Sequence, residues 1–145
     1  KNTQKSRHQF WPISWALGNR MNMTIVVLLF LMLTSCDSGT QWSDGSYSVY
    51  WIDTRENRQL GYDIGDGSAI GRVEGEVIGV GANSKYVVAR RINHSNGNIE
   101  YFYIEKSKDH KFKNWNEISV GPLTEVEINE KTSELMLPKI SMEFN

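Results

Sequence analysis

KYVVARRINHSNGNIEYFYIE, residues 85–105, carries the clearest strand and turn signals in this chain. Each half is rich in β-branched and aromatic residues that alternate between two faces, as in a strand. The residues sharing one face are Tyr86, Val88 and Arg90 in the first half and Ile99, Tyr101 and Tyr103 in the second. Between the halves, Asn96-Gly97 favours a hairpin turn because both residues tolerate positive φ. We therefore predict an antiparallel hairpin with strands over 85–92 and 99–105.

Further strands are predicted upstream of this hairpin. Residues 47–52 are aromatic and β-branched, with Tyr47, Val49 and Trp51 on one face. Residues 60–64 form a second, weaker strand. The stretch 69–80 has three glycines among its apolar residues, and glycine inside a strand marks a bulge or a bend. We expect one long, strongly curved strand or two short ones there.

Downstream of the hairpin, the sequence predicts a helix. Thr124-Glu125-Val126-Glu127 is a capping box, in which the Thr hydroxyl and the second Glu carboxylate each satisfy a free backbone N–H. A helix is therefore expected from Glu125 to about Met136, ended by Pro138. The alternative is a strand, because Val126 and Ile128 alternate with charged residues.

The region between hairpin and helix is predicted to be a loop and a strand. Residues 106–113 are lysine-rich and are expected to form a solvated connector, and residues 115–120 a short strand. The connector contains Ser107, Asp109 and His110, the residue types of a hydrolase triad. A nucleophile elbow of the form Gly-x-Ser-x-Gly does not occur, so the loop interpretation is preferred.

Together these patterns predict one mainly β domain of the α+β class, over residues 47–145. We expect an antiparallel curved sheet or a small open barrel of about five or six strands with one C-terminal helix. After the helix, residues 139–145 either return as an edge strand or fray.

A different pattern occupies residues 21–36. Residues 25–33 are apolar without a break. This run is shorter than the roughly 20 residues of a membrane helix but suits a signal-peptide core of about 7–15 residues. It is followed by Leu33-Thr34-Ser35-Cys36, an aliphatic residue, two small residues and the one cysteine of the chain. The alternative is a buried core segment with Cys36 as a chance neighbour.

Leu33-Thr34-Ser35-Cys36 resembles the lipobox of bacterial lipoprotein precursors. The resemblance implies a diacylglycerol on the Cys36 thiol, cleavage just before Cys36, and a lipid anchor in a membrane of the cell envelope. The following Asp37 implies retention in the inner membrane, facing the periplasm, in a Gram-negative organism. On this interpretation residues 1–20 are a basic extension before the start at Met21 or Met23, and 21–35 are the signal peptide. The small, polar residues 36–46 are then a flexible tether.

A second resemblance covers the C-terminal half. The strand pair within 86–104, followed by Gly121-Pro122-Leu123-Thr124 and a short acidic helix, is similar to a group of small uncharacterised bacterial lipoproteins. It implies the same location in the envelope and no assigned activity.

The charge of the mature part limits its partners. Four of the 16 basic residues and none of the 17 acidic ones precede Cys36, so residues 36–145 carry a formal net charge of −5. Nucleic-acid binding calls for a basic patch and is not expected. The favoured function is a non-catalytic module that binds a protein or an envelope component, with an immunity protein against a toxin as a subclass.

The aromatic residues suggest where such a partner would bind. The predicted interaction face consists of Tyr50, Trp51, Tyr86, Arg90, Tyr101 and Tyr103, residue types that are enriched at interaction hot spots. The alternative is that these side chains pair across strands within the protein's own sheet.

No catalytic, metal or cofactor site is predicted from the spacing of the ionisable residues. The glycines between 65 and 81 match neither dinucleotide nor phosphate loops. The alternative function is an envelope enzyme that uses carboxylates such as Asp63, Asp66 and Glu76 in a sheet-lined pocket.

Overall fold

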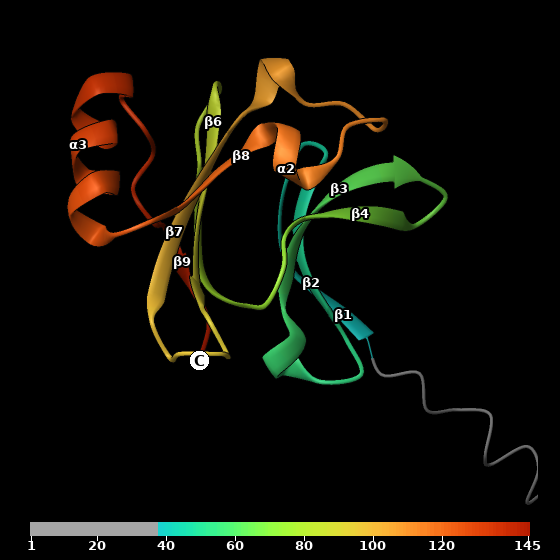
Figure 1. Cartoon of the computed structure of the whole chain (residues 1–145). Coiled ribbons are helices and arrows are strands. Elements are labelled where there is room, and N and C mark those ends of the chain that lie inside the picture. The colour runs from blue at the N-terminus through green and yellow to red at the C-terminus, as the bar shows by residue number, and fades with distance from the viewer. Residues whose placement is uncertain (1–37) are drawn as a thin grey trace, which may run out of the picture. The chain divides into compact units, whose positions relative to one another are not determined.

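The computed structural model describes residues 38–145, which form two antiparallel sheets and short helices (Figure 1). The first sheet has the order β1-β2-β3-β4. Its strands are β1 (Ser38–Asp44), β2 (Tyr47–Ile52), β3 (Gln59–Gly65) and β4 (Ser68–Val73), with the 3₁₀ turn η1 (Arg55–Asn57) between β2 and β3. Each strand follows its neighbour in sequence, so this sheet is a simple meander.

The second sheet has the order β8-β7-β6-β5-β9. Its strands are β5 (Glu76–Ala82), β6 (Tyr86–Ile92), β7 (Ile99–Glu105), β8 (Ser119–Leu123) and β9 (Met142–Glu143). The predicted hairpin is confirmed, since β6 and β7 pair in register from Tyr86↔Glu105 to Ile92↔Ile99. Its turn is longer than a two-residue loop: the carbonyl of Asn93 accepts hydrogen bonds from the N–H groups of Asn96 and Gly97.

The predicted mainly β class is thus confirmed, and the two sheets remain open and do not close into a barrel. The described residues contain nine strands, more than the five or six expected. β1 and β9 form in segments predicted as a tether and as a strand or frayed end, and the 69–80 stretch divides between the two sheets. Gly75 makes this change of sheet possible, because its φ of 93° lies in the left-handed region. The interpretation as two short strands, β4 and β5, is therefore the correct one.

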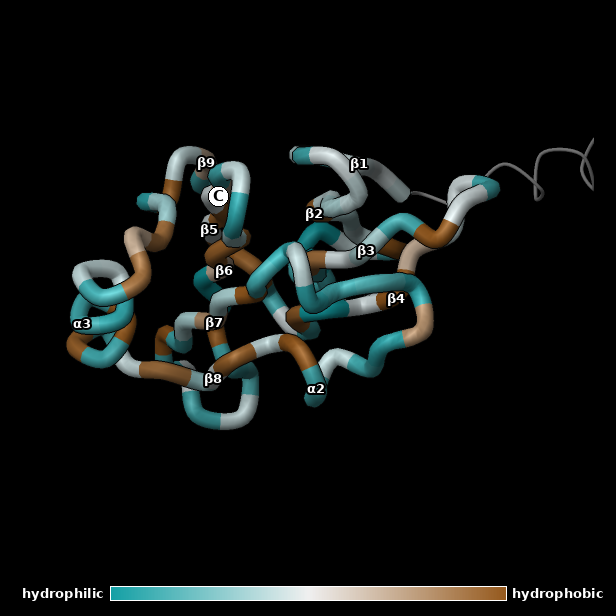
Figure 2. The backbone as a smooth tube through the Cα atoms, turned by 90° about the horizontal axis from the view of Figure 1, so that it is seen from above, coloured by the Kyte–Doolittle hydropathy of each residue, from teal (hydrophilic) through white to brown (hydrophobic). Residues whose placement is uncertain are grey.

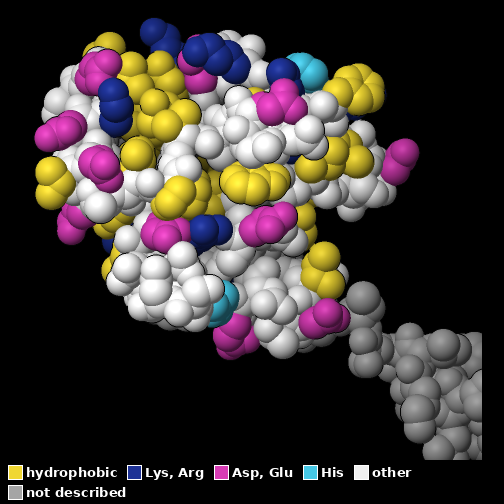
Figure 3. All heavy atoms as spheres, in the orientation of Figure 1, with side chains coloured by type: hydrophobic (Ala, Val, Ile, Leu, Met, Phe, Trp, Pro, Cys, Tyr) yellow, Lys and Arg dark blue, Asp and Glu magenta, His cyan; other side chains and the backbone are white. Residues whose placement is uncertain are grey.

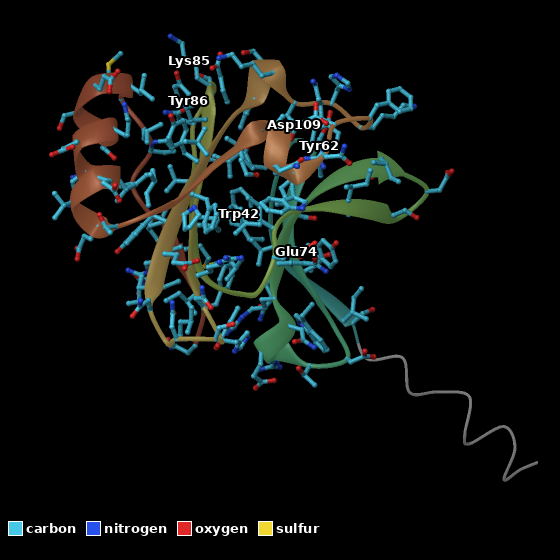
Figure 4. The ribbon with its side chains drawn as sticks, in the orientation of Figure 1. Trp42, Tyr62, Glu74, Lys85, Tyr86 and Asp109 are labelled. Carbon is cyan, nitrogen blue, oxygen red and sulfur yellow. The ribbon has the colours of Figure 1, made fainter. Side chains whose placement is uncertain are left out.

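The predicted tether is replaced by a strand where the structure describes it. Residues 38–44 form β1, which pairs antiparallel with β2 from Ser38↔Ile52 to Asp44↔Tyr47. Trp42 lies between the two sheets (Figure 4) and packs against the main core. Strand pairing and the partly buried side chain of Trp42 order this segment, although its polar composition indicated flexibility. The basic extension, the signal peptide and Cys36 lie outside the described residues.

The main core fills the space between the two sheets. Inward residues of the first sheet meet inward residues of the second, and hydrophobic segments are concentrated in β5, β6 and β7 (Figure 2). The buried members are Tyr47, Val49, Leu60, Val73, Val77, Val80, Val87, Ala89, Phe102, Ile104 and Phe144. Both sheets have one face in this core, which is the arrangement of a two-layer β domain.

A second, smaller core lies on the outer face of the second sheet, under helix α3 (Glu125–Leu135). The predicted helix is confirmed together with its capping box. The Thr124 hydroxyl accepts a hydrogen bond from the Glu127 N–H, and the Glu127 carboxylate accepts one from the Thr124 N–H. The backbone hydrogen bond from Thr124 lowers the pKa of Glu127. The helix ends at Met136, which is left-handed with a φ of 55°.

The prediction of a strand over 115–120 was wrong for its first part. Residues 115–118 form the short helix α2 (Trp115–Ile118), and β8 begins at Ser119. A second capping box starts α2, with Asn114 at its N-cap and Glu117 reaching back to the Asn114 N–H. No helix within residues 38–145 has the length and apolar character needed to cross a bilayer.

After α3, the chain crosses the outer face of β5. The crossing segment, residues 137–141, passes so close to Gly81 that a Cβ there would overlap the Lys139 carbonyl. Leu137 and Ile140 complete the second core. The chain then pairs with β5 as β9, so residues 142–143 return as an edge strand.

Candidate functional site

The candidate site is a groove of about 620 Å³ on the first sheet, between the β1–β2 and β3–β4 hairpins. Its volume lies in the range of about 300–1,000 Å³ typical of ligand sites. The lining residues are Ser38, Gly39, Thr40, Ser43, Gly45, Ser46, Tyr47, Ser48, Tyr50, Trp51, Ile52, Asp63, Gly67, Ser68 and Ala69. We call this feature the sheet groove.

The sheet groove is lined mainly by small and hydroxyl-bearing residues. Nine of its fifteen residues are Ser, Thr or Gly, and none is Lys or Arg. Asp63 is the one carboxylate among them, and its Oδ1 accepts a hydrogen bond from the Gly65 N–H at 2.7 Å. The groove therefore offers donors and acceptors without a cation that would neutralise a phosphate or carboxylate.

Tyr50 is the aromatic residue of the groove that points away from the core. It is half-buried and follows Val49, which points inward. Its ring covers Gly61 on β3: a Cβ on Gly61 would lie 2.5 Å from the Tyr50 Cε1 atom. Burial, with a smaller contribution from Glu74, raises the pKa of the Tyr50 hydroxyl. The hydroxyl is therefore protonated at neutral pH and can both donate and accept a hydrogen bond.

Trp51 borders the groove from the opposite face of β2. Its side chain is only 8% exposed and packs beneath Gly39, where a Cβ would lie 3.0 Å from the indole Nε1 atom. Gly39 thus allows β1 to pass closely over the indole. Of the six residues in the predicted interaction face, Tyr50 and Trp51 are the two that line the sheet groove.

The other four residues of the predicted face lie on the second sheet. Tyr86, Tyr101 and Tyr103 pack against the second core, and the Tyr86 and Tyr103 rings meet edge to face with their centroids 6.3 Å apart. Arg90 forms an ion pair with Glu143 at 3.1 Å. Alternation placed these four residues on one sheet face, but α3 and the crossing segment pack on that face. The six residues do not form a single surface.

The carboxylates of the alternative enzyme are also divided. Asp63 and Asp66 lie at the β3–β4 hairpin of the first sheet, both exposed. Glu76 begins β5 in the second sheet and faces Arg58 at 3.9 Å. No group of three or more His, Cys, Asp or Glu side chains within 38–145 is arranged to hold a metal ion. The three carboxylates therefore form no common site.

Asp109, predicted to lie in a solvated loop, is instead buried. Both of its oxygens accept hydrogen bonds from the guanidinium of Arg72 on β4, with Nη2 to Oδ1 and Nε to Oδ2 each 2.9 Å. The Tyr47 hydroxyl also donates a hydrogen bond to Asp109, at 2.9 Å. Burial raises the pKa of Tyr47, so this hydroxyl is protonated and can donate. The Arg72–Asp109 pair fixes the lysine-rich loop to the first sheet.

Ser107, Asp109 and His110, the residue types of a hydrolase triad, do not hydrogen-bond to one another in this arrangement. Asp109 binds Arg72, which also donates a hydrogen bond to the His110 carbonyl at 3.1 Å. The Ser107 hydroxyl donates to Glu105 at 2.8 Å, and the His110 side chain is exposed. The buried pair was missed because Arg72 lies 37 positions from Asp109, a separation without a sequence signal.

No protein-family model, curated protein or solved structure matches this chain.

Proposed function

We propose that this chain is a lipid-anchored protein of the bacterial cell envelope whose domain is a non-catalytic binding module. The sequence Leu33-Thr34-Ser35-Cys36 supports the anchor, since two or three acyl chains hold a domain on a bilayer stably. The sheet groove supports the binding function. Its hydroxyl-rich lining, which contains no Lys or Arg and includes the ring of Tyr50, is the observation that carries the proposal.

The chemistry of the groove favours binding over catalysis. Hydrolysis of a glycosidic bond uses two carboxyl groups about 5–10 Å apart, and the groove has the single carboxylate of Asp63. That carboxylate is exposed and accepts a hydrogen bond from the Gly65 N–H, and no second carboxylate lines the groove to act as its partner.

The same lining selects the class of ligand. Serine and threonine hydroxyls and backbone groups form hydrogen bonds with an uncharged ligand that has many hydroxyl groups, and the exposed face of Tyr50 offers a stacking surface for its C–H groups. An anionic ligand would find no Lys or Arg in the groove. We therefore propose a neutral glycan segment of the envelope as the ligand.

The anchor is tested by replacing Cys36 with alanine in the full chain expressed in a bacterium. The wild type is expected to gain the mass of a diacylglycerol and to sediment with membranes, whereas C36A does neither, because the thiol is the acylated atom. Intact mass and membrane fractionation make the comparison. Identical, unmodified and soluble products would show that residues 25–33 belong to the fold instead.

The groove is tested by filling it. Ala69 lines the groove on β4 and is half-buried, so A69W is expected to block the ligand and weaken binding to insoluble cell-wall glycan by about tenfold, or 1.4 kcal/mol. Co-sedimentation of the purified protein with that glycan measures the effect.

The matched control is S133W, which adds the same side chain to an exposed position of α3. It is expected to bind as the wild type does. Thermal unfolding checks that both variants fold. Equal binding by A69W and S133W would exclude the groove, and absence of binding by the wild type would exclude the glycan and favour a protein partner.

A further inference from the structure

The chain leaves almost no distance between the proposed anchor and the folded domain. The first residue of β1 is Ser38, two positions after Cys36, and two residues span at most about 7 Å when fully extended. A lipid on Cys36, which rests on the proposed function, would therefore hold Ser38 next to the headgroups. A domain on a long flexible tether would have no such constraint.

Strand pairing determines which residues accompany Ser38. Ser38 pairs with Ile52 across β1 and β2, and paired residues in an antiparallel ladder have Cα atoms about 5 Å apart. The start of β1, the end of β2, η1 and the β6–β7 turn all lie at one end of the domain (Figure 1). We call this the anchor end.

The anchor end exposes large apolar side chains. Ile52 is 46% exposed, and Ile99, at the β6–β7 turn, is 51% exposed. Exposed apolar side chains gain free energy when they enter the boundary between headgroups and acyl chains. The turn between Ile52 and η1 adds Asp53, and η1 contains Arg55 and Glu56. This small, mixed set of charges gives no preference for anionic lipids.

The basic side chains gather at the other end. Residues 106–113 contain four lysines, and this segment lies at the end of the domain opposite η1 (Figure 1). Dark blue side chains accordingly follow the upper edge of the space-filling view (Figure 3). The Arg72–Asp109 pair holds this lysine-rich loop in place. Electrostatic attraction to anionic lipid would act on that end, and insertion of the Phe112 side chain, which is 81% exposed, would favour the same orientation. The short connection to Cys36 therefore favours one orientation, and these two interactions favour the opposite one.

We infer that the anchor end rests directly on the bilayer, with Ile52 in the headgroup region and the lysine-rich loop directed away from the membrane. Ser38 and Ile52 also line one end of the sheet groove, so that end faces the headgroups. A ligand reaches the groove from the other end, at Ser43 and Ser68. The partner of the anchor end is the lipid bilayer itself. The covalent connection dominates because a bound acyl anchor holds Ser38 near the headgroups at all times, whereas the attraction of exposed lysines is screened by salt within about 8 Å.

The test uses the single cysteine of the chain. Acylation consumes the Cys36 thiol, so a cysteine introduced elsewhere is the one thiol left for labelling. I52C and F112C place it at the anchor end and in the lysine-rich loop, where Phe112 is 81% exposed. Each full-chain variant is purified from bacterial membranes, labelled with an environment-sensitive fluorophore, and reconstituted into vesicles of phosphatidylcholine and phosphatidylglycerol with or without a quencher attached to the lipid.

Quenching is expected for the label at 52 and not for the label at 112. Intact mass, measured first, separates the two proposals. If the acyl mass is present but quenching is equal at both positions, or stronger at 112, the inferred orientation is wrong and the anchor stands. If the acyl mass is absent, the anchor fails and the inference fails with it.

Discussion

Replacing Asp109 with alanine is expected to lower the free energy of unfolding by about 3–5 kcal/mol, the usual effect of removing one partner of a buried ion pair. The Arg72 side chain has no exposed surface, so D109A leaves a guanidinium in the interior without its two carboxylate contacts. The Tyr47 hydroxyl loses its acceptor as well. Urea unfolding followed by tryptophan fluorescence measures the change.

Two variants show whether burial of the charge is the cause. E130A removes a carboxylate from an exposed position of α3 and is expected to change stability by no more than about 0.5 kcal/mol. The double variant R72M/D109L replaces both charges with apolar groups and is expected to recover much of the loss, since such replacements are often neutral or stabilising. A D109A protein as stable as E130A would mean that the pair is solvated.

Replacing Gly81 with alanine is expected to destabilise the domain by about 1–3 kcal/mol, as overpacking of a close contact does. The added methyl group would overlap the Lys139 carbonyl, which is backbone and cannot rotate away. The crossing segment must then lift from β5, and Leu137 and Ile140 lose contacts in the second core. Urea unfolding gives the global effect, and faster amide exchange over residues 137–144 would locate it.

Gly71 provides the matched control for this substitution. It also lies within a strand, but a Cβ there would meet the end of the flexible Gln59 side chain at 3.1 Å. G71A is therefore expected to be neutral, or slightly stabilising because alanine loses less conformational entropy on folding than glycine. Equal destabilisation by G71A and G81A would show that loss of glycine in a strand, and not the crossing segment, causes the effect.

Local signals were sufficient to predict the central hairpin and α3. Alternation and Asn96-Gly97 act within one hairpin, and the Thr124 capping box acts within one helical turn. A capping box also occurs at Asn114 and Glu117 and starts α2. The prediction of a strand over 115–120 did not take this capping box into account. In these regions the structure follows from residues a few positions apart.

Features that depend on distant residues were not predictable. β1 has a polar composition, and its order comes from pairing with β2 and from Trp42 in the core. The burial of Asp109 depends on Arg72 in another strand. For the site, aromatic residues with strand-like alternation indicated Tyr50 and Trp51, and the acidic residues of the 60–67 segment included Asp63. The serines and glycines around them gave no signal, because their contribution arises when two hairpins bring them together.

The segment after α3 also has a consequence for how the protein is made. Phe144 is part of the main core and Leu137 of the second core, so both cores require residues near position 140. While that segment is still inside a ribosome or a secretion channel, the residues already outside cannot bury their apolar surface fully. The domain would then close into its final structure only after Phe144 had emerged. If the chain is exported as proposed, this delay would keep it unfolded while it crosses the membrane.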